Sequence, residues 1–266
     1  MRRSLALSLV LATGFAGAAA RAQNAPDQNT MTWAWKIPDG RWITVRNMNG
    51  RVTVQRATGD SVTVTATKHW RRGDPSIVHF DVQHFGEDNQ DVLLCALWGP
   101  DAHCTPGSYD ARYEGHERNN DVRVDFVVSV PAGVKVGAHT VNSDVSVTGV
   151  TSEVRASTVN GAVNVATDGG PVSASSVNGT VHASMLHYRP TSEMRFSSVN
   201  GSVIVELGND VDADVELSTV NGRFMTDFPV TLNGHIDPRH LRATLGKGGS
   251  RIIMRTVNGN VELRKH

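Results

Sequence analysis

The amino-acid sequence predicts an all-β protein organised as a β-solenoid, in which the short strands of successive repeats stack on one another. Three observations support this fold class. The tripeptide Val-Asn-Gly recurs along the second half of the chain, and apolar residues alternate with polar ones on both sides of each copy. No stretch shows the 3.6-residue apolar period of an amphipathic helix, so we expect little helix.

The repeat is centred on an asparagine. Five copies of Val-Asn-Gly follow a Ser or Thr, and a sixth copy has Ser143 in place of the glycine. The predicted Asn-Gly corners are Asn142, Asn160, Gly161, Asn178, Gly179, Asn200, Gly201, Asn221, Gly222, Asn258 and Gly259. Their asparagines are 18, 18, 22, 21 and 37 residues apart, and Met48-Asn49-Gly50 looks like an earlier, isolated unit. Periods of this length are typical of stacked β architectures.

Alignment on the asparagine predicts two short strands per repeat, each with one buried face. Positions six and four before the asparagine are apolar, as in Val172 and Ala174, and so is the position three after it, as in Val181. We also expect the valine directly before each asparagine to pack inward on the valine of the next rung. The asparagines would then form a hydrogen-bonded ladder, and each glycine would supply a positive φ.

A second architecture is compatible with the same motif. Asn-Gly between alternating strands is a strong signal for a β-hairpin with a type I′ turn, which would give an antiparallel β-sandwich or meander. The near-constant valines before and after each asparagine favour the solenoid, because stacking places equivalent residues on one another. A meander imposes no such identity on successive turns.

These residues resemble a bacterial putative adhesin family, a domain of unknown function built from tandem T-V-N-G-x-V-x-V repeats. The resemblance is carried by 124–133, where a strand closes on Pro131-Ala132-Gly133, by the six rungs, and by 246–263. It implies a secreted or surface-exposed β-helix-like domain for which adhesion is proposed, and it implies no catalytic residues. The chain departs from the family pattern at Ser143 and in a long insert at 70–120.

The first 22 residues have the features of a secretory signal peptide. Arg2 and Arg3 precede an apolar segment at 5–12, and Ala20-Arg21-Ala22 fits a cleavage site. Residues 23–30 are expected to form a disordered leader. We therefore expect an exported protein, in the periplasm, at the cell surface or outside the cell, with no membrane-spanning segment after cleavage. The loss of three arginines leaves 23 basic and 26 acidic residues, a balance that argues against nucleic acid as a partner.

We expect residues 31–120 to form an N-terminal β cap with a Cys/His-rich insert, ahead of the repeat domain at 121–266. Cys95 and Cys104 are the only cysteines, and their short separation in an exported chain predicts a disulfide. The stretch 69–120 holds five of the eleven histidines, among them His79 and His84. These two should face opposite sides of a strand, so we predict no metal site.

The candidate catalytic groups are few. Asp210, Asp212 and Asp214 alternate along a predicted strand and could share a face, but a charged face that discourages edge pairing is the simpler interpretation. Arg155, Arg195 and Glu216 occupy equivalent outward positions and could contact an extended ligand. We predict no catalytic residue and no cofactor.

The function predicted from the sequence is that of a secreted or surface-associated, non-enzymatic β-repeat protein. It would act as an adhesin-like or cell-envelope structural or binding module, with a cell-surface glycan or protein as its partner. The alternative is a carbohydrate-active enzyme, a polysaccharide lyase or glycosidase on a β-helix scaffold. A cleft lined by clustered acids and aromatic side chains would favour this alternative.

Overall fold

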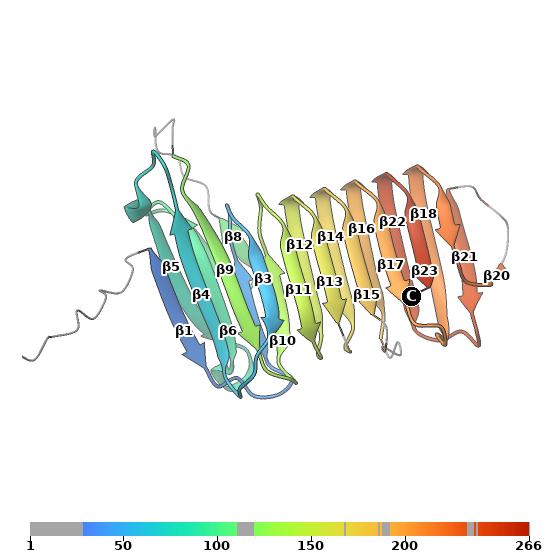
Figure 1. Ribbon diagram of the computed structural model, residues 1–266, viewed down its shortest axis with the longest axis horizontal. Helices are drawn as coiled ribbons and strands as arrows, with labels where there is room; N and C mark the ends of the chain where they lie inside the picture. The colour runs from blue at the N-terminus through green and yellow to red at the C-terminus, as the bar shows by residue number, and fades with distance from the viewer. Residues whose placement is uncertain are drawn as a thin grey trace, which may run out of the picture.

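The computed structural model describes residues 29–110, 120–167, 169–185, 187, 192–232, 237 and 239–265. These residues form two large β-sheets that face each other across one hydrophobic core (Figure 1), with a small hairpin outside them. Two short 3-10 helices, η1 (Pro75–Ile77) and η2 (Glu87–Asn89), are the helical elements of this part of the chain. None of its helices is long and apolar enough to cross a membrane. The predicted signal peptide and most of the predicted leader lie outside the described residues.

Sheet A and sheet B contain most of the strands. The order of sheet A is β1 (Thr30–Trp35), β4 (Val62–His69), β9 (Arg123–Val130), β3 (Val52–Arg56), β11 (Val145–Val150), β13 (Val163–Thr167), β15 (Val181–Met185), β17 (Val203–Leu207), β23 (Val261–Lys265), β19 (Phe224–Thr226). The order of sheet B is β20 (Thr231–Leu232), β21 (His240–Leu245), β18 (Ala213–Asn221), β22 (Arg251–Asn258), β16 (Met194–Asn200), β14 (Val172–Asn178), β12 (Val154–Asn160), β10 (Lys135–His139), β2 (Trp42–Arg46), β6 (Asp91–Trp98), β5 (Val78–Phe85). The outer hairpin is β7 (His103–Thr105) and β8 (Ser108–Asp110).

Each repeat forms one rung with a strand in each sheet. In the rung centred on Asn160, β12 in sheet B ends at the corner and β13 in sheet A follows it. Equivalent strands of adjacent rungs are parallel and in register, so that Val154 pairs with Val172. The β-solenoid-like stack is confirmed. The hairpin alternative is wrong for the repeats, because the strands on either side of Asn-Gly lie in different sheets and do not pair with each other.

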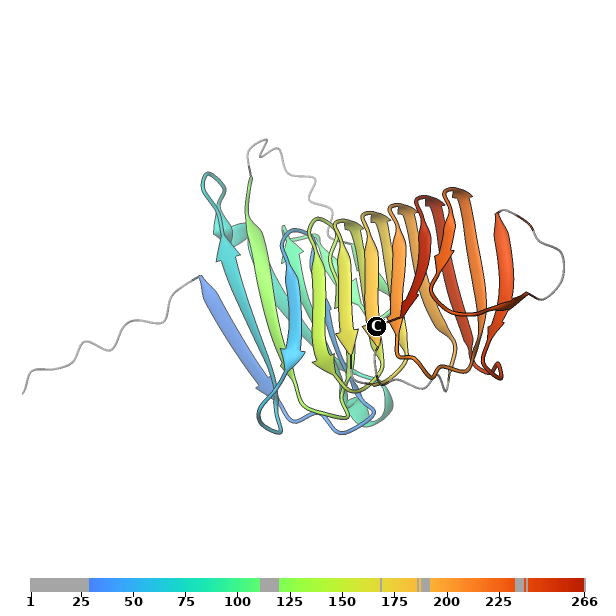
Figure 2. The ribbon, with the colours of Figure 1, turned by 45° about the vertical axis from the view of Figure 1, so that its right-hand side comes forward.

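The order of the rungs in space differs from their order in the chain. The unit at Asn49, which looked isolated in the sequence, is the first rung, because β2 and β3 pair with β10 and β11. At the other end, β22 and β23 lie between the rung of Asn200 and the rung of Asn221 (Figures 1 and 2). Within the segment 227–249, strands β20 and β21 extend sheet B beyond β18.

The corner asparagines form a continuous ladder along the stack. Each side-chain amide nitrogen donates a hydrogen bond to the side-chain oxygen of its neighbour toward the N-terminal end, at 2.8 to 2.9 Å. The spatial order of the ladder is Asn49, Asn142, Asn160, Asn178, Asn200, Asn258, Asn221. The ladder ties together rungs that are as far apart in sequence as Asn49 and Asn142.

The orientation predicted for the valine before each asparagine is wrong. Val159, Val177 and Val199 are 37 to 40% exposed on the outer face of sheet B. The buried residue of the corner is the Ser or Thr one position earlier. Ser176, for example, is 4% exposed and donates a hydrogen bond to the carbonyl oxygen of Gly161 in the neighbouring rung at 2.8 Å. The hydroxyl satisfies a carbonyl that the corner would otherwise leave without a partner.

The corner glycines are needed mostly for close packing and not for a positive φ. Gly50 and Gly259 have positive φ values of 119° and 156°, but Gly161, Gly179, Gly201 and Gly222 do not. A Cβ atom at Gly179 would lie 1.8 Å from the carbonyl oxygen of Gly161. Each corner therefore rests directly on the backbone of the corner before it, which leaves no space for a side chain.

Candidate functional site

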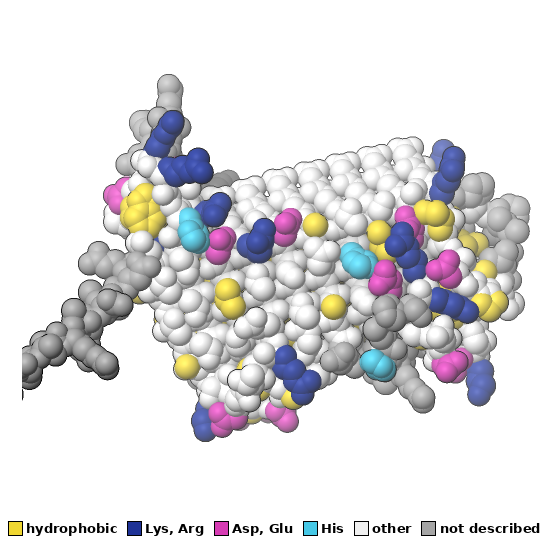
Figure 3. All heavy atoms as spheres, viewed as in Figure 1, with side chains coloured by type: hydrophobic (Ala, Val, Ile, Leu, Met, Phe, Trp, Pro, Cys, Tyr) yellow, Lys and Arg dark blue, Asp and Glu magenta, His cyan; other side chains and the backbone are white. Residues whose placement is uncertain are grey.

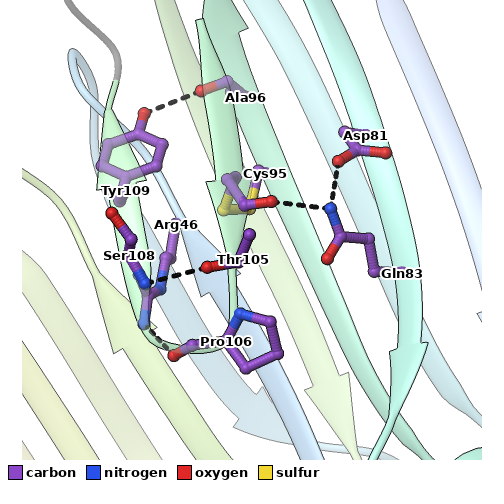
Figure 4. Close-up of a disulfide and its surroundings, with 10 residues drawn as sticks. Arg46, Asp81, Gln83, Cys95, Ala96, Thr105, Pro106, Ser108 and Tyr109 are labelled. Atoms are coloured by element: carbon purple, nitrogen blue, oxygen red, sulfur yellow. Dashed lines mark hydrogen bonds between the residues drawn. A yellow bond between two sulfur atoms is a disulfide. The ribbon is translucent and has the colours of Figure 1, made fainter.

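The β7–β8 hairpin lies on the outer face of sheet B and is fixed there by the predicted disulfide. Cys95 on β6 is bonded to Cys104 on β7, as Figure 4 shows. Around the disulfide, Leu93, Leu97 and Ala102 form a second, smaller apolar cluster. The hydroxyl of Tyr109 donates a hydrogen bond to the carbonyl oxygen of Ala96 at 2.7 Å, so the hairpin forms a rigid wall beside the stack.

The outer faces of the two sheets carry different rows of side chains. The face of sheet A shown in Figure 3 is mostly uncharged over β3, β11 and β13, where Thr53, Ser146 and Asn164 lie in one row. On sheet B, the in-register stacking places Arg46, His139 and Ser157 in one row, three positions before each corner asparagine. A second row contains Gly137 and Arg155. Pairing of β10 with β2 and β12 therefore places the charged group of Arg46 beside the polar groups of His139 and Ser157.

A groove opens where this face meets the hairpin. Its volume is about 260 Å³, and its lining is Trp42, Thr44, Arg46, Phe85, Asp91, Leu93, Pro106, Gly137, His139 and Arg155. We call it the Arg46 groove. Gly137 forms part of the floor, where a Cβ atom would lie 2.7 Å from the Thr44 hydroxyl oxygen. The guanidinium of Arg155 lies 4.4 Å from the centre of the Trp42 ring, a cation–π contact that fixes both side chains at one edge of the groove.

Arg46 is the least satisfied charged group of the groove. Its Nη2 donates a hydrogen bond to the carbonyl oxygen of Pro106 at 2.7 Å, while its Nε is buried without a hydrogen-bond partner. Among the described residues, no carboxylate forms an ion pair with it, and burial lowers the pKa of its guanidinium. A half-buried cation without an anionic partner is electrostatically unfavourable. An anion bound in the groove would relieve this.

His139 lies beside Arg46 and is neutral at physiological pH. Burial, together with the smaller effect of the positive charges of Arg46 and Arg155, lowers the pKa of His139 to about 4. Its Nδ1 lies 2.7 Å from the hydroxyl oxygen of Ser157. The imidazole therefore offers the groove a neutral hydrogen-bonding group next to the fixed positive charge of Arg46.

The lowered pKa of His139 predicts a loss of stability in acid. Between the pH values of the unfolded pKa, about 6.5, and the folded pKa, about 4, only the unfolded chain binds a proton at this residue, so stability falls as the pH falls through this window. We expect the wild type to lose about 2 kcal/mol more unfolding free energy between pH 7.5 and 4.5 than His139→Gln does. Urea unfolding of both proteins at the two pH values measures the difference. Equal losses would contradict the assignment.

The sequence also drew attention to histidines as possible metal ligands and to aspartates as possible catalytic groups. The described chain contains no cluster of three potential metal ligands, and His116 lies outside it. Asp212 accepts a hydrogen bond from the backbone nitrogen of Lys247, and Asp214 accepts one from Gly249. These two aspartates therefore hold the turn at 246–249. The predicted role against edge pairing is wrong for Asp214, since β18 pairs on both sides, and Asp212 lies just before that strand.

A larger cleft at the C-terminal end of the stack contains clustered acidic side chains, which a glycosidase would need for catalysis. It has a volume of about 710 Å³ and is lined by Glu193, Asp214, Val215, Glu216, Arg242, Ala243, Gly249 and Arg251. Arg255 donates a hydrogen bond of 2.5 Å to Glu216 and lowers the pKa of that carboxyl group. A general acid needs a raised pKa, so Glu216 is adapted to an ion pair and not to proton donation. Arg155 and Arg195 are likewise paired, with Glu153 and Glu193.

Sequence analysis did not single out Trp42, Arg46 or His139. The signal was present, because alignment of the Asn49 unit with the later rungs places Arg46 three positions before its asparagine, in the same column as His139. Because the Asn49 unit was treated as isolated, Arg46 was not aligned with the later rungs.

Neither the family models nor the curated proteins include a match to this chain. Among solved structures, the chain is similar to a putative cell adhesion protein from Clostridium sporogenes, at 10% identity and a TM-score of 0.42, over 89% of this chain and 100% of that chain. It is also similar to a putative adhesin from Bacteroides fragilis, at 9% identity and a TM-score of 0.27, over 91% of this chain and 99% of that chain.

Proposed function

We propose that this protein is an exported, adhesin-like, non-catalytic binding module that holds an acidic group of an envelope or surface glycan in the Arg46 groove. The observation that supports this most directly is the half-buried guanidinium of Arg46, which has no carboxylate partner among the described residues. A carboxylate or sulfate offers a guanidinium two acceptor oxygens in a matching plane. Such a group would satisfy the charge that the fold leaves without an anion.

The size of the groove indicates how much of a ligand enters it. Pockets that enclose a whole drug-sized molecule measure about 300–1,000 Å³, so a groove of about 260 Å³ suits one acidic substituent or one sugar unit. The remainder of an extended chain would lie along the sheet. From His139 the same row continues through Ser157, Ser175 and Ser197, which offer hydroxyl groups to a ligand that runs in the direction of the stack.

The construction of the site supports binding without catalysis. The Asn ladder and the disulfide hold the two sides of the groove in place, so little conformational entropy is lost when a ligand binds. The disulfide itself agrees with an extracytoplasmic location, where disulfides persist. His139, the histidine of the groove, has a pKa of about 4 and therefore makes a poor general base near neutral pH.

Replacing Arg46 tests the proposal. We expect the exported protein to bind an immobilised acidic polysaccharide, such as polygalacturonate or a sulfated glycan, and to bind neutral dextran far more weakly. Arg46→Gln should weaken acidic-glycan binding about 10- to 100-fold, because a hydrogen bond to a charged group contributes about 1.5–3 kcal/mol. Biolayer interferometry at 0.15 M salt gives the dissociation constants. Comparison of the carboxylated and sulfated polymers identifies the preferred acidic group.

The matched control is Arg56→Gln, which removes the same charge from an exposed position on β3. It should bind like the wild type. The proposal fails if the wild type binds no acidic polymer. It also fails if Arg46→Gln and Arg56→Gln weaken binding equally, since the effect would then come from the net charge and not from the groove.

A further inference from the structure

β1 is the outermost strand of sheet A at the N-terminal end, and within the described chain it pairs on one side only, with β4. The backbone nitrogen of Lys68 on β4 donates to the carbonyl oxygen of Asn29 at 2.7 Å. Hydrogen-bonded and non-hydrogen-bonded pairs alternate in an antiparallel ladder. Residues 31, 33 and 35 therefore direct their backbone groups toward β4, while Thr30, Thr32 and Ala34 direct theirs away from the sheet.

This edge lacks the features that usually prevent strand pairing. β1 is six residues long, contains no charged residue and no proline, and keeps its register with β4 without a bulge. The remaining edges are different. β19 and β20 are only three and two residues long, and β5 carries Asp81 and two histidines. Short or charged edges resist pairing, whereas a long uncharged edge of β-forming residues offers a template for another strand.

Apolar side chains accompany the open edge on the inner side of the sheet. Trp33 packs edge-on against Phe80, with ring centres 5.2 Å apart, but remains half-buried. Met31 is 48% exposed, although its partner Ala66 on β4 is completely buried. The hydrophobic core therefore reaches the end of the stack without being fully covered there.

We propose that β1 pairs in an antiparallel arrangement with β1 of a second copy of this chain, so that sheet A continues from one molecule into the other. The strand is complementary to itself about Thr32. A two-fold axis there sets Thr32 against the partner's Thr32 and Thr30 against the partner's Ala34, and all outward backbone groups of the strand form hydrogen bonds. It also sets Met31 against the partner's Trp33, a sulfur–aromatic contact that covers the exposed methionine. No charged side chain of either strand enters the pairing.

The oligomeric state tests this inference directly. Sedimentation velocity of the exported protein over a range of concentrations should show a species of twice the monomer mass that increases with concentration. Thr32→Pro removes a backbone N–H that points away from β4, so the β1–β4 pairing should remain while the dimer is lost. Thr32→Val changes the same side chain, keeps the N–H, and should dimerise like the wild type. Ala34→Lys adds a charge at the edge and should also abolish the dimer if Thr32→Pro proves unstable.

Cysteine substitution tests the register. Thr32→Cys should form a disulfide between two copies in air, because directly opposed residues in such a pair lie within disulfide range. Thr30→Cys should not, since its neighbour in the second copy is Ala34. A non-reducing gel separates the two results. A protein that is monomeric at every concentration, or a dimer that Thr32→Pro and Ala34→Lys leave intact, would overturn the proposal. Crosslinking through Thr30→Cys and not Thr32→Cys would overturn its register.

Discussion

Gly179→Ala is expected to lower the free energy of unfolding by about 3 kcal/mol or more. The added Cβ atom would meet three backbone atoms of the neighbouring rung, with the carbonyl oxygen of Gly161 at 1.8 Å. Backbone atoms cannot turn aside as a flexible side chain can, so the rungs must separate locally or the corner must be rebuilt. The same displacement would stretch the Asn178–Asn160 hydrogen bond of the ladder. Urea unfolding followed by circular dichroism measures the loss.

Gly59→Ala is the matched control. Gly59 lies in an exposed turn, and a Cβ atom there would have no other atom within 4 Å. Its substitution should change the free energy of unfolding by less than about 1 kcal/mol, because it creates no clash and alanine restricts the unfolded chain. If Gly179→Ala proved as mild as this control, the corners would have to be more loosely stacked than the structure indicates.

The repeat predicted the architecture because stacking leaves a periodic imprint on the sequence. Equivalent strands in register require equivalent residues, which is why Val163, Val181 and Val203 recur at one position and are all buried. The same periodicity predicts the correct orientation of the valine before each asparagine. Positions six and four before the asparagine point inward, so the position two before it must do so as well, and the valine next to the asparagine must point outward. The prediction gave the hydrophobicity of that valine more weight than strand alternation.

The order of the rungs could not be predicted in the same way. Because the rungs are nearly identical, each offers its neighbours the same pairing surface, and sequence order is the natural assumption. The segment 227–249 changes the order. It is long enough to form β21 on the far side of β18, so the chain then returns as β22 between β18 and β16.

The Arg46 groove was missed for a related reason. Arg46 and His139 are far apart in sequence, and only the pairing of β2 with β10 brings them together. The third part of the groove, the β7–β8 hairpin, has no repeat signal at all. The disulfide between Cys95 and Cys104 was predictable, but the face of sheet B on which it holds the hairpin depends on tertiary packing.

Phe196→Ala is expected to destabilise the protein by about 3–5 kcal/mol, since it removes a large aromatic side chain from a close-packed core. Phe196 is 1% exposed and lies in register between Ala174 and Met254, so its ring fills space that the small Ala174 leaves open in the neighbouring rung. The surrounding strands are fixed by the ladder and cannot collapse into the cavity. Thermal and urea unfolding of the variant, with circular dichroism as the signal, measure the effect.

Val199→Ala on the same strand separates core packing from strand propensity. Val199 is 40% exposed on the outer face of sheet B, three residues from Phe196. Its truncation should cost less than about 1 kcal/mol, because it removes little buried area and leaves no cavity. A large loss of unfolding free energy in Val199→Ala would mean that Val199 is buried, either because it points inward, as the motif first suggested, or because the outer face is covered. If Val199→Ala loses little unfolding free energy and Phe196→Ala loses much, the stability of the repeat comes from the inward-facing core positions. The valines before the asparagines would then be exposed on the same face as the Arg46 groove.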